Sequence, residues 1–343
     1  MTTSRHERAL TDCGWLPLEQ LSGTAVLVTG GTGLIGYNII KELCALSDCL
    51  RPRIFALVRN RQKAEKTLAA FGDRVQLITG DVQEPLSVDG PIDYIIHGAS
   101  ITSSRSFVEQ PVETIMTSVM GVRNLLELAR EKKVRSMVYL SSMEVYGSPT
   151  QDRLLTEKDL DYLDPLAVRS SYPQSKRLCE ALCTAYASQH GVPVKIARLA
   201  QTFGPGMQPG DRRAIIQFLE SALSHQDIHI KASGESARMY LYTFDAVSAL
   251  LTILLNGQNS AAYNIANKES YCSIRVLAET IVQMFSPHNQ VFVNTGTQQE
   301  RAIYPPDSFL RLDVSKLERL GWAPQVCLRE GLQILGQTLN DTH

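Results

Sequence analysis

Tyr172 and Lys176 stand four residues apart and form the spacing in this sequence with the most direct chemical use. Residues four apart on a helix share a face, so the phenol and the ammonium lie near each other. A phenol titrates near about 10 and needs a nearby cation to serve as acid or base at neutral pH. Ser142, at the end of an expected strand, brings a hydroxyl to the same rim. These three residues predict acid–base catalysis by the phenol.

A glycine-rich turn at residues 30–36 joins an expected strand to an expected helix. The glycines permit a tight turn, close approach of a pyrophosphate to the backbone, and close packing of the helix on the strand. The phosphate charge then lies at the helix N-terminus. We therefore predict a bound nicotinamide dinucleotide. The contacts expected from this turn are Gly30, Thr32, Gly33, Leu34, Ile35 and Gly36.

Arg59 follows the second expected strand, where an acidic residue would bind the ribose hydroxyls of the adenosine. A cation at this place suits a 2′-phosphate, which favours NADP over NAD. A solvated arginine is the alternative interpretation. Asp81 follows the third expected strand and is placed to accept from the adenine amine, unless it is an ordinary turn aspartate.

The elements that must position these residues alternate between short apolar runs and longer helical patterns. The expected strands are Thr24–Thr29, Arg53–Val58, Val75–Thr79, Tyr94–His97, Ser136–Leu140 and Val192–Ala197. The expected helices are Leu34–Leu46, Gln62–Phe71, Val112–Glu131 and Ser170–His190. Such alternation predicts an α/β fold with a doubly wound parallel (Rossmann) sheet.

After Arg198 the pattern loosens into loops and two further helices, Arg213–Ser224 and Ser273–Phe285. This change predicts a smaller C-terminal α/β lobe that binds the substrate. We expect an N-terminal extension at residues 1–22 and a dinucleotide-binding domain at 23–200. Residues 201–343 then form mainly the substrate lobe, with some strands returning to the sheet.

Composition excludes several function classes. The net charge is −1 and no basic run occurs, which gives no electrostatic case for nucleic acid. The run 246–255 is too short to span a bilayer, and the N-terminus lacks the apolar stretch of a signal peptide. We expect a cytoplasmic protein without membrane contact. The seven cysteines form no CxxC pair, so no metal is predicted.

The glycine turn, Ser142 and the YxxxK pair resemble those of the extended short-chain dehydrogenase/reductase superfamily, and within it the NAD(P)-dependent nucleotide-sugar epimerase/dehydratase family. The resemblance covers about residues 24–336. Besides the glycine turn and YxxxK, it is carried by segments 80–82, 97–100, 121–127, 140–147, 203–206, 263–267 and 320–322.

The resemblance implies a role for each residue of the catalytic group. Tyr172 would remove a proton from a sugar hydroxyl while hydride passes to the nicotinamide. Ser142 would hydrogen-bond the same oxygen, and Lys176 would lower the pKa of the phenol and hold the ribose. The oxidised position would be C4 of a hexose on a nucleoside diphosphate, and the tightly bound cofactor would return its hydride. Further implied cofactor contacts are Val82, Ala99 and Ser118, the last standing where an asparagine is usual.

The two residues after Ser142 bear on the chemical step that comes after the oxidation. Glu144 resembles the glutamate of 4,6-dehydratases and uronate decarboxylases, where it would remove the C5 proton, or it is a structural carboxylate. Met143 stands where some dehydratases place an aspartate that protonates the departing 6-hydroxyl, and a thioether cannot do so. Because Glu144 is present, dehydration or decarboxylation is favoured, and 4-epimerisation stays open.

The resemblance also implies substrate contacts and an assembly. Arg198 and Arg238 match positions that frame or grip a diphosphate, and Arg213 is a weaker candidate. Met143 and Gln201 are expected near the sugar, with Gln201 replacing a common asparagine. A homodimer is expected through the helices at Val112–Glu131 and Ser170–His190.

Two other functions remain open. Arg59 motivates an NADPH-dependent carbonyl reductase that exchanges free cofactor. A dinucleotide-sensing protein without catalytic activity is the other interpretation, although such proteins often lose the YxxxK pair that this chain keeps.

Overall fold

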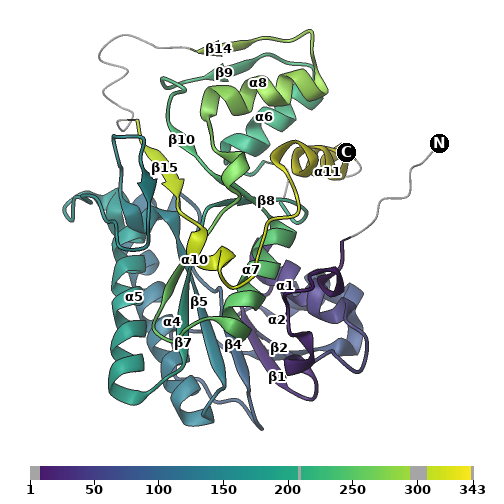
Figure 1. Ribbon diagram of the computed structural model, residues 1–343, viewed down its shortest axis with the longest axis vertical. Helices are drawn as coiled ribbons and strands as arrows, with labels where there is room; N and C mark the ends of the chain where they lie inside the picture. The colour runs from purple at the N-terminus through teal and green to yellow at the C-terminus, as the bar shows by residue number, and fades with distance from the viewer. Residues whose placement is uncertain (1–7, 208–209, 294–306, 341–343) are drawn as a thin grey trace.

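The computed structural model describes residues 8–207, 210–293 and 307–340. Its centre is a seven-stranded sheet with the order β12-β7-β5-β4-β1-β2-β3, and all neighbouring strands are parallel (Figure 1). The strands are β1 (Ala25–Thr29), β2 (Arg53–Val58), β3 (Val75–Thr79), β4 (Tyr94–His97), β5 (Ser136–Ser142), β7 (Val194–Leu199) and β12 (Ala262–Ile265). This architecture confirms the predicted α/β fold with a doubly wound parallel sheet.

Alternate residues of the strands enter two separate apolar layers. On β1, Val26 and Val28 pack into one layer, whereas Ala25 and Leu27 pack into the other. Because strand side chains alternate between faces, a sheet covered on both sides needs apolar residues at almost every position. This requirement explains the nearly continuous apolar runs in the sequence.

Two pairs of helices cover these faces. One layer receives α1 (Leu34–Ala45) and α7 (Thr243–Asn256), which contact each other. The other receives α4 (Pro111–Lys132) and α5 (Ser171–His190), which also pack together. The long helices thereby fix the carboxyl edge of the sheet, where β1, β2, β4 and β5 end.

The upper part of the molecule in Figure 1 is built from the second half of the chain. It contains α6 (Ala214–Leu223), α8 (Ile274–Phe285) and α11 (Leu328–Asn340), with α6 packed on α8. The short strands of this half are β8 (Gln201–Phe203), β9 (Ile228–Ile230), β10 (Ala237–Arg238), β11 (Tyr240–Tyr242), β13 (Cys272–Ser273), β14 (Val291–Val293) and β15 (Phe309–Leu312). A further strand, β6 (Leu154–Leu155), pairs with β15, so this part also takes in residues before 200.

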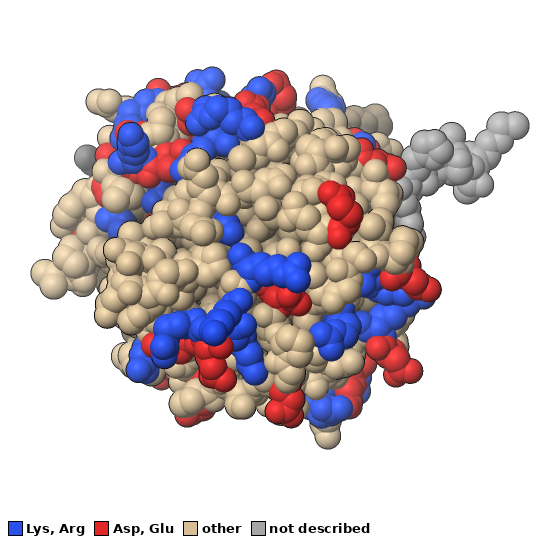
Figure 2. Space-filling view, turned by 60° about the horizontal axis from the view of Figure 1, so that its bottom comes forward, with Lys and Arg blue, Asp and Glu red and all other residues tan. Residues whose placement is uncertain are grey.

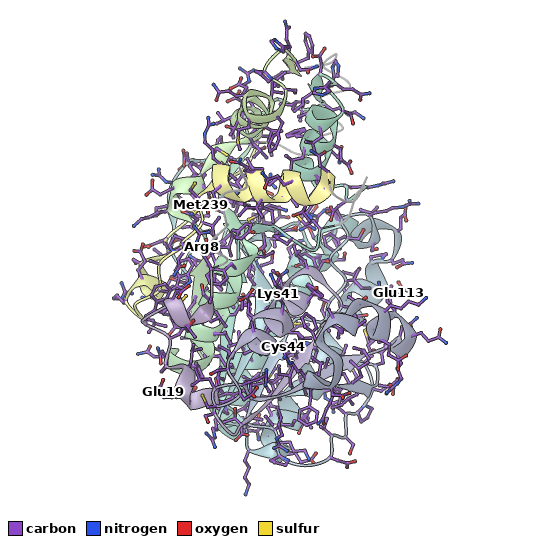
Figure 3. All side chains as sticks on the ribbon, turned by 90° about the vertical axis from the view of Figure 1, so that its right-hand side faces the viewer. Arg8, Glu19, Lys41, Cys44, Glu113 and Met239 are labelled. Carbon is purple, nitrogen blue, oxygen red and sulfur yellow. The ribbon has the colours of Figure 1, made fainter. Side chains whose placement is uncertain are left out.

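The N-terminal segment is part of the packed structure. Leu10 and Leu21 are buried in the layer that contains α1 and α7. Trp15 donates to Thr252 on α7 over 3.2 Å. Figure 3 looks onto this side, where Arg8 pairs with Glu330 of α11 over 2.7 Å. The segment therefore ties the two ends of the described chain together.

Two elements differ in their bounds from the expected ones. β7 begins and ends two residues later than the expected strand Val192–Ala197. The expected helix Gln62–Phe71 is interrupted: α2 (Arg61–Thr67) ends before a 3-10 segment in which Gly72 has φ 52°.

The surface shows both signs of charge. On the face seen in Figure 2, lysine and arginine side chains lie beside aspartate and glutamate side chains. Among the described helices, none is long and apolar enough to cross a lipid bilayer.

Candidate active site

Ser142 is positioned by the end of β5, where the strand turns directly into a 3-10 segment at Met143–Tyr146. Its hydroxyl caps that segment by accepting from the amide of Glu144 over 3.2 Å. On the neighbouring strand β7, Leu199 pairs with it in register. Ser142 is therefore held at the carboxyl edge of the sheet, where ligands of doubly wound folds bind.

Tyr172 lies in the first turn of α5, and the structure brings its phenol to Ser142. The two side chains share a hydrogen bond. Tyr172 is only 7 % exposed, and burial is the main cause that raises the pKa of its phenol. The charge of Glu144 raises this pKa further, while the hydrogen bond with Ser142 and the charge of Arg169 lower it. The predicted catalytic group is thus assembled around a buried phenol.

Lys176 lies one turn after Tyr172 and points back under β5. Its Nζ donates to the carbonyl of Leu140 over 2.7 Å and lies 5.6 Å from the centroid of the Tyr172 ring. Burial lowers the pKa of Lys176 to about 8. Its ammonium is therefore close to the phenol ring, but its hydrogen bond in this structure goes to the strand.

Glu144 reaches the same site from the 3-10 segment after β5. Its carboxylate accepts from the guanidinium of Arg169 over 3.0 Å, with the two side chains 30 % and 46 % exposed. An ion pair this exposed contributes only about 0.2–1 kcal/mol to stability. The Glu144 side chain faces an arginine at the site rather than backbone amides, and Met143 beside it is buried.

An aromatic side chain backs the phenol. The ring of Phe107, on α3 (Ser106–Glu109), stacks on Tyr172 with centroids 4.3 Å apart and an interplanar angle of 8°. Arg169 lies over the same Phe107 ring at 4.8 Å from its centroid. The hydroxyl of Ser171 donates to the Phe107 carbonyl over 2.8 Å, which fixes α3 against the start of α5.

The glycine turn has the shape that a pyrophosphate requires. Gly30 has φ 75°, and a Cβ there would lie 2.9 Å from the backbone of Gly98. Gly33 is the N-cap of α1 and supplies no side-chain cap. The amides of the first helical turn have no partner within the helix, so they are free to donate to a phosphate. These residues fit a dinucleotide.

The other expected cofactor contacts lie along the same edge of the sheet. Arg59 directly follows β2 and is exposed, and Ala99 follows β4 with its amide donating to Thr29 over 3.1 Å. Asp81 accepts from the amide of Gln83 over 2.9 Å, as in an ordinary turn. Ser118 on α4 is buried, with its hydroxyl donating to Thr114 and 3.3 Å from that of Ser100.

Val82 is also placed at this edge by α4. It is buried, and its carbonyl accepts from the Asn124 side chain over 2.9 Å. Because Asn124 also donates to Glu84, one side chain of α4 holds the turn after β3. In the sequence, only the family resemblance pointed to Val82, whereas the structure shows how it is held.

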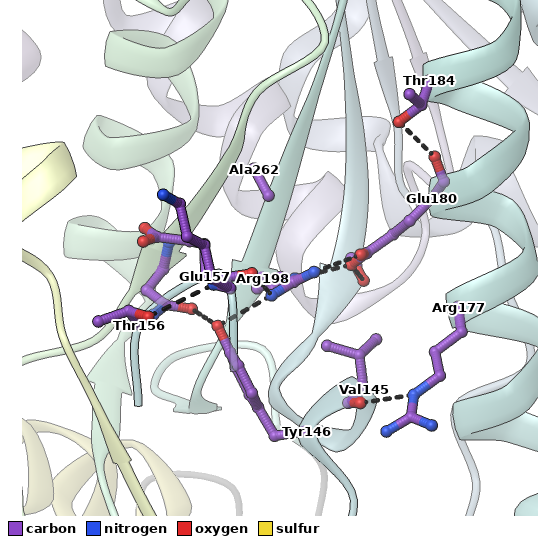
Figure 4. Close-up of polar contacts among 12 residues, drawn as sticks. Val145, Tyr146, Thr156, Glu157, Arg177, Glu180, Thr184, Arg198 and Ala262 are labelled. Atoms are coloured by element: carbon purple, nitrogen blue, oxygen red, sulfur yellow. Dashed lines mark hydrogen bonds and ion pairs between the residues drawn. The ribbon is translucent and has the colours of Figure 1, made fainter. Parts of the chain in front are cut away.

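The expected diphosphate contact at Arg198 is wrong. Arg198 lies on β7 and is buried, and its guanidinium binds both oxygens of Glu180 at 2.6 and 3.0 Å (Figure 4). Its third nitrogen donates to the Tyr146 hydroxyl and to the Glu157 carbonyl at 3.0 and 2.9 Å. A buried arginine needs such partners, so Arg198 holds elements together.

The remaining substrate candidates differ in what holds them. Arg213 is half-buried and bound to Asp211 at 2.6 Å and to the Thr202 carbonyl at 3.1 Å. Arg238 lies on β10, and its Nε is buried without a hydrogen-bond partner in the described structure. Gln201 begins β8 and is half-buried. Of these side chains, Arg238 has the unsatisfied donor that an anionic ligand would use.

Phe107 and Arg169 were not predicted from the sequence. Phe107 belongs to a four-residue helix that no periodicity reveals. Arg169 lies three residues before Tyr172, and a cation so close to a candidate acid–base tyrosine was the available signal.

The sequence profile of the NAD dependent epimerase/dehydratase family matches residues 26–266. The chain belongs to this family. UDP-glucuronic acid decarboxylase 6 of Arabidopsis thaliana is 33 % identical over 318 residues, covering 92 % of this chain and 88 % of that protein. UDP-glucuronic acid decarboxylase 1 of Xenopus tropicalis is 31 % identical over 307 residues, covering 90 % and 70 %.

Solved structures share the fold at lower identity. UDP-glucose 4-epimerase of Thermotoga maritima superposes with a TM-score of 0.77 at 22 % identity, covering 93 % of this chain and 99 % of that one. The dTDP-glucose 4,6-dehydratase of Bacillus anthracis, in complex with NAD, gives 0.75 at 21 % identity, covering 93 % and 97 %. The family confirms that the protein is an enzyme and uses a nicotinamide dinucleotide.

Proposed function

We propose that this enzyme decarboxylates a nucleoside-diphosphate hexuronate, with UDP-glucuronate as the first substrate to test. The observation that carries the proposal is the set of Ser142, Glu144, Tyr172 and Lys176 gathered at one edge of the sheet. Met143, a residue without an acidic proton, stands between Ser142 and Glu144 in the chain. The similarity to UDP-glucuronic acid decarboxylases over most of the chain supports this choice.

The first step is oxidation at C4. Ser142 and Tyr172 bind the C4 hydroxyl, and the Tyr172 phenolate takes its proton as the hydride leaves C4. A nicotinamide dinucleotide held at the glycine turn of Gly30, Gly33 and Gly36 would supply the hydride acceptor for this oxidation. Lys176 holds a positive charge beneath the phenol ring. The product of the step is a 4-keto sugar that stays in the site.

The second step breaks the bond between C5 and C6. A 4-keto hexuronate is a β-keto acid, so its carboxylate leaves as carbon dioxide and the electron pair forms an enolate across C4 and C5. A proton that comes from solvent adds at C5, and the reaction is completed when the hydride returns to C4 and Tyr172 gives its proton back to the C4 oxygen. No group has to protonate a departing 6-hydroxyl, which is the step that Met143 cannot perform. The site therefore suits decarboxylation better than 4,6-dehydration.

We assign Arg238 to an anionic group of the substrate. Its buried Nε lacks a partner in the described structure, and a buried unpaired donor costs about 1–3 kcal/mol unless a ligand satisfies it. A diphosphate or carboxylate oxygen supplies that acceptor through a charge-assisted bond. Arg213, already bound to Asp211, is a weaker candidate.

The test is incubation of the purified enzyme with UDP-glucuronate and a panel of UDP-, dTDP-, GDP- and CDP-hexoses in deuterated water, followed by mass spectrometry and NMR. We expect loss of carbon dioxide from the uronate and deuterium at C5 of the product. A Tyr172→Phe variant should keep the bound cofactor and lose activity by about 10²–10⁴-fold. Loss of water from a neutral hexose, or an inverted C4 with unchanged mass, would replace the proposal by dehydration or epimerisation.

For the cofactor, we propose a preference for NADP, supported by Arg59 at the end of β2. An exposed guanidinium there suits a 2′-phosphate. Mass spectrometry of the cofactor released from the purified protein tests this directly. Arg59→Asp should weaken NADP binding and leave NAD binding nearly unchanged. Equal binding of both cofactors by the wild type would overturn the preference.

We also propose that the enzyme is a homodimer formed through α4 and α5. Large apolar side chains are exposed on and beside these helices: Val108, Val112, Ile115, Met116, Leu178 and, in the segment before α5, Leu160, Tyr162, Leu166 and Val168. Exposed apolar groups gathered on one pair of helices support an interface with a second copy.

A further inference from the structure

Two charged residues of opposite sign, Glu144 and Arg169, act on the phenol of Tyr172. Burial is the main cause that raises the pKa of Tyr172. Glu144, from the segment after β5, raises this pKa further, and the hydrogen bond with Ser142 and the charge of Arg169, from the 3-10 segment Val168–Ser170, lower it. The side chains of Glu144 and Arg169 bind each other over 3.0 Å. The pKa of the Tyr172 phenol is therefore affected by both members of an ion pair and not by a single charge.

The position of Arg169 is fixed by more than this ion pair. Its guanidinium lies over the Phe107 ring at 4.8 Å, and the same ring stacks on Tyr172 at 4.3 Å. Phe107 is 2 % exposed and is tied to α5 through Ser171. A planar guanidinium suits such a stacked place, whereas a lysine would keep the charge but lose the flat contact.

The other charged groups near Tyr172 are already engaged. Lys176 donates to the Leu140 carbonyl beneath the ring. Glu109 of α3 pairs with Arg105, the residue directly before this helix, and both side chains are exposed. Among the described residues packed around Tyr172, Arg169 is the cation that directly opposes Glu144.

We propose that Arg169 is a positioning residue of the reaction, which holds the Glu144 carboxylate in the site and offsets its negative charge at Tyr172. This inference rests on the proposed C4 oxidation by Tyr172. It assigns a role to a residue outside the serine–tyrosine–lysine group. Arg169 acts through Glu144 and Phe107 and takes no proton itself.

The first experiment follows reduction of the bound nicotinamide at a range of pH values after rapid mixing with UDP-glucuronate. This step precedes any role of Glu144 at C5. Removing the positive charge in Arg169→Met leaves Glu144 unopposed and raises the pKa of Tyr172. The rising limb of the rate profile should therefore move to higher pH. A shift of about one unit lowers the rate about tenfold at a pH below the limb.

Matched variants separate charge from structure. Glu144→Gln should move the limb to lower pH, and the double variant should lie close to wild type. Arg169→Lys should recover part of the Arg169→Met loss. Arg130→Met, which removes an arginine from a similarly exposed ion pair with Glu127 on α4, should leave the profile unchanged. If the pH at which the reduction rate rises is the same in Arg169→Met, Glu144→Gln and the wild type, the proposal is overturned.

A second readout needs no turnover. Tyrosine labelled at Cζ gives an NMR resonance for Tyr172, assigned by its loss in Tyr172→Phe, that moves as the phenol ionises. We expect ionisation at lower pH in Glu144→Gln than in wild type, and at higher pH in Arg169→Met. If no sugar reduces the cofactor, the proposed function fails, but this order of titration still supports the role of Arg169. Identical titrations in the three proteins would disprove it.

Discussion

At the scale of single residues, the cofactor turn requires glycine, because a Cβ atom at some of its positions would collide with the backbone. A Cβ on Gly36 would lie 2.3 Å from the Gly30 carbonyl oxygen and 2.9 Å from the Cα of Gly31. Both neighbours are backbone atoms of the turn itself. They cannot move aside without changing the path of the phosphates along the turn.

We therefore expect Gly36→Ala to abolish tight cofactor binding, with at least about a 100-fold loss of affinity, since about 3 kcal/mol of strain corresponds to that factor. Isothermal titration with NADP and NAD measures it. Gly14→Ala is the control, because a Cβ there meets nothing within 4 Å. Unchanged affinity in Gly36→Ala would show that the turn is not the phosphate site.

Site residues could be predicted from the sequence where regular secondary structure determines their position. Ser142, Tyr172 and Lys176 follow from a strand end and a helical spacing, and the structure brings them together. Arg198 was misread because its partner Glu180 lies on another element, and a single sequence does not show which buried charges meet. Phe107 and Arg169 were missed for the same reason, since they reach Tyr172 through short segments whose docking is tertiary.

At the scale of elements, a buried polar network joins α5 to the sheet. Glu180 binds Arg198 on β7 (Figure 4). Glu180 also accepts from Ser141 on β5 over 2.6 Å, and the Tyr146 hydroxyl connects Arg198 to Asn264 on β12. α5 carries both Tyr172 and Lys176. The network therefore fixes the position of α5, with Tyr172 and Lys176, relative to β5, the strand that carries Ser142.

Glu180→Ala should lower the free energy of unfolding by about 3–5 kcal/mol, because it leaves the Arg198 guanidinium buried without its counter-charge. The double variant Glu180→Leu with Arg198→Met should lose less than Glu180→Ala alone, since no charge stays buried. Urea unfolding of the three proteins measures both effects. A double variant less stable than Glu180→Ala would mean that packing, not charge compensation, dominates here.

Lys195 on β7 gives an element-scale effect of pH. It is 5 % exposed, its Nζ donates to the Ser136 hydroxyl over 2.6 Å, and burial lowers its pKa to about 8. The unfolded chain binds this proton up to about pH 10.4. Between these values the unfolded state holds more protons, so the contribution of Lys195 to stability rises with pH. Below pH 8 the buried ammonium is a net cost.

We expect Lys195→Met to raise the free energy of unfolding by about 2 kcal/mol at pH 7, with the gain shrinking as pH rises through 8 toward about 10.4. Urea unfolding at several pH values in this window measures it. Lys41→Met, at an exposed position of α1 that Figure 3 labels, should show little change at any pH. A gain that does not depend on pH would trace to packing alone.

The extent to which elements were predictable follows from their surroundings. The strands between residues 24 and 200 belong to a sheet covered on both faces, so each of them is recognisable in the sequence as a nearly continuous apolar run. β12 was not predicted, although it joins the sheet beside β7, because its four residues include the polar Asn264. The two-residue strands β6, β10 and β13 are defined by their pairing partners, which the local sequence pattern does not contain.

At the scale of the whole molecule, the proposed dimer follows from where apolar side chains remain exposed. Val112 and Met116 on α4 are 65 % and 44 % exposed, and Leu178 on α5 is 48 % exposed. These helices pack against each other with their inner sides in the core and leave their outer sides to solvent. A stable interface buries about 1,200–2,000 Å² in total, which two long helices from each copy supply.

The variant Met116→Glu with Leu178→Glu places charges where the two copies would meet. Burying unpaired charges costs several kcal/mol, and about 2.7 kcal/mol weakens association roughly 100-fold. Sedimentation velocity at micromolar concentration should therefore give a dimer for the wild type and a monomer for this variant. Val276→Glu, at an exposed apolar position on α8 away from these helices, is the control and should remain dimeric. A wild type that sediments as a monomer would leave the exposed apolar surface of α4 and α5 without its proposed partner.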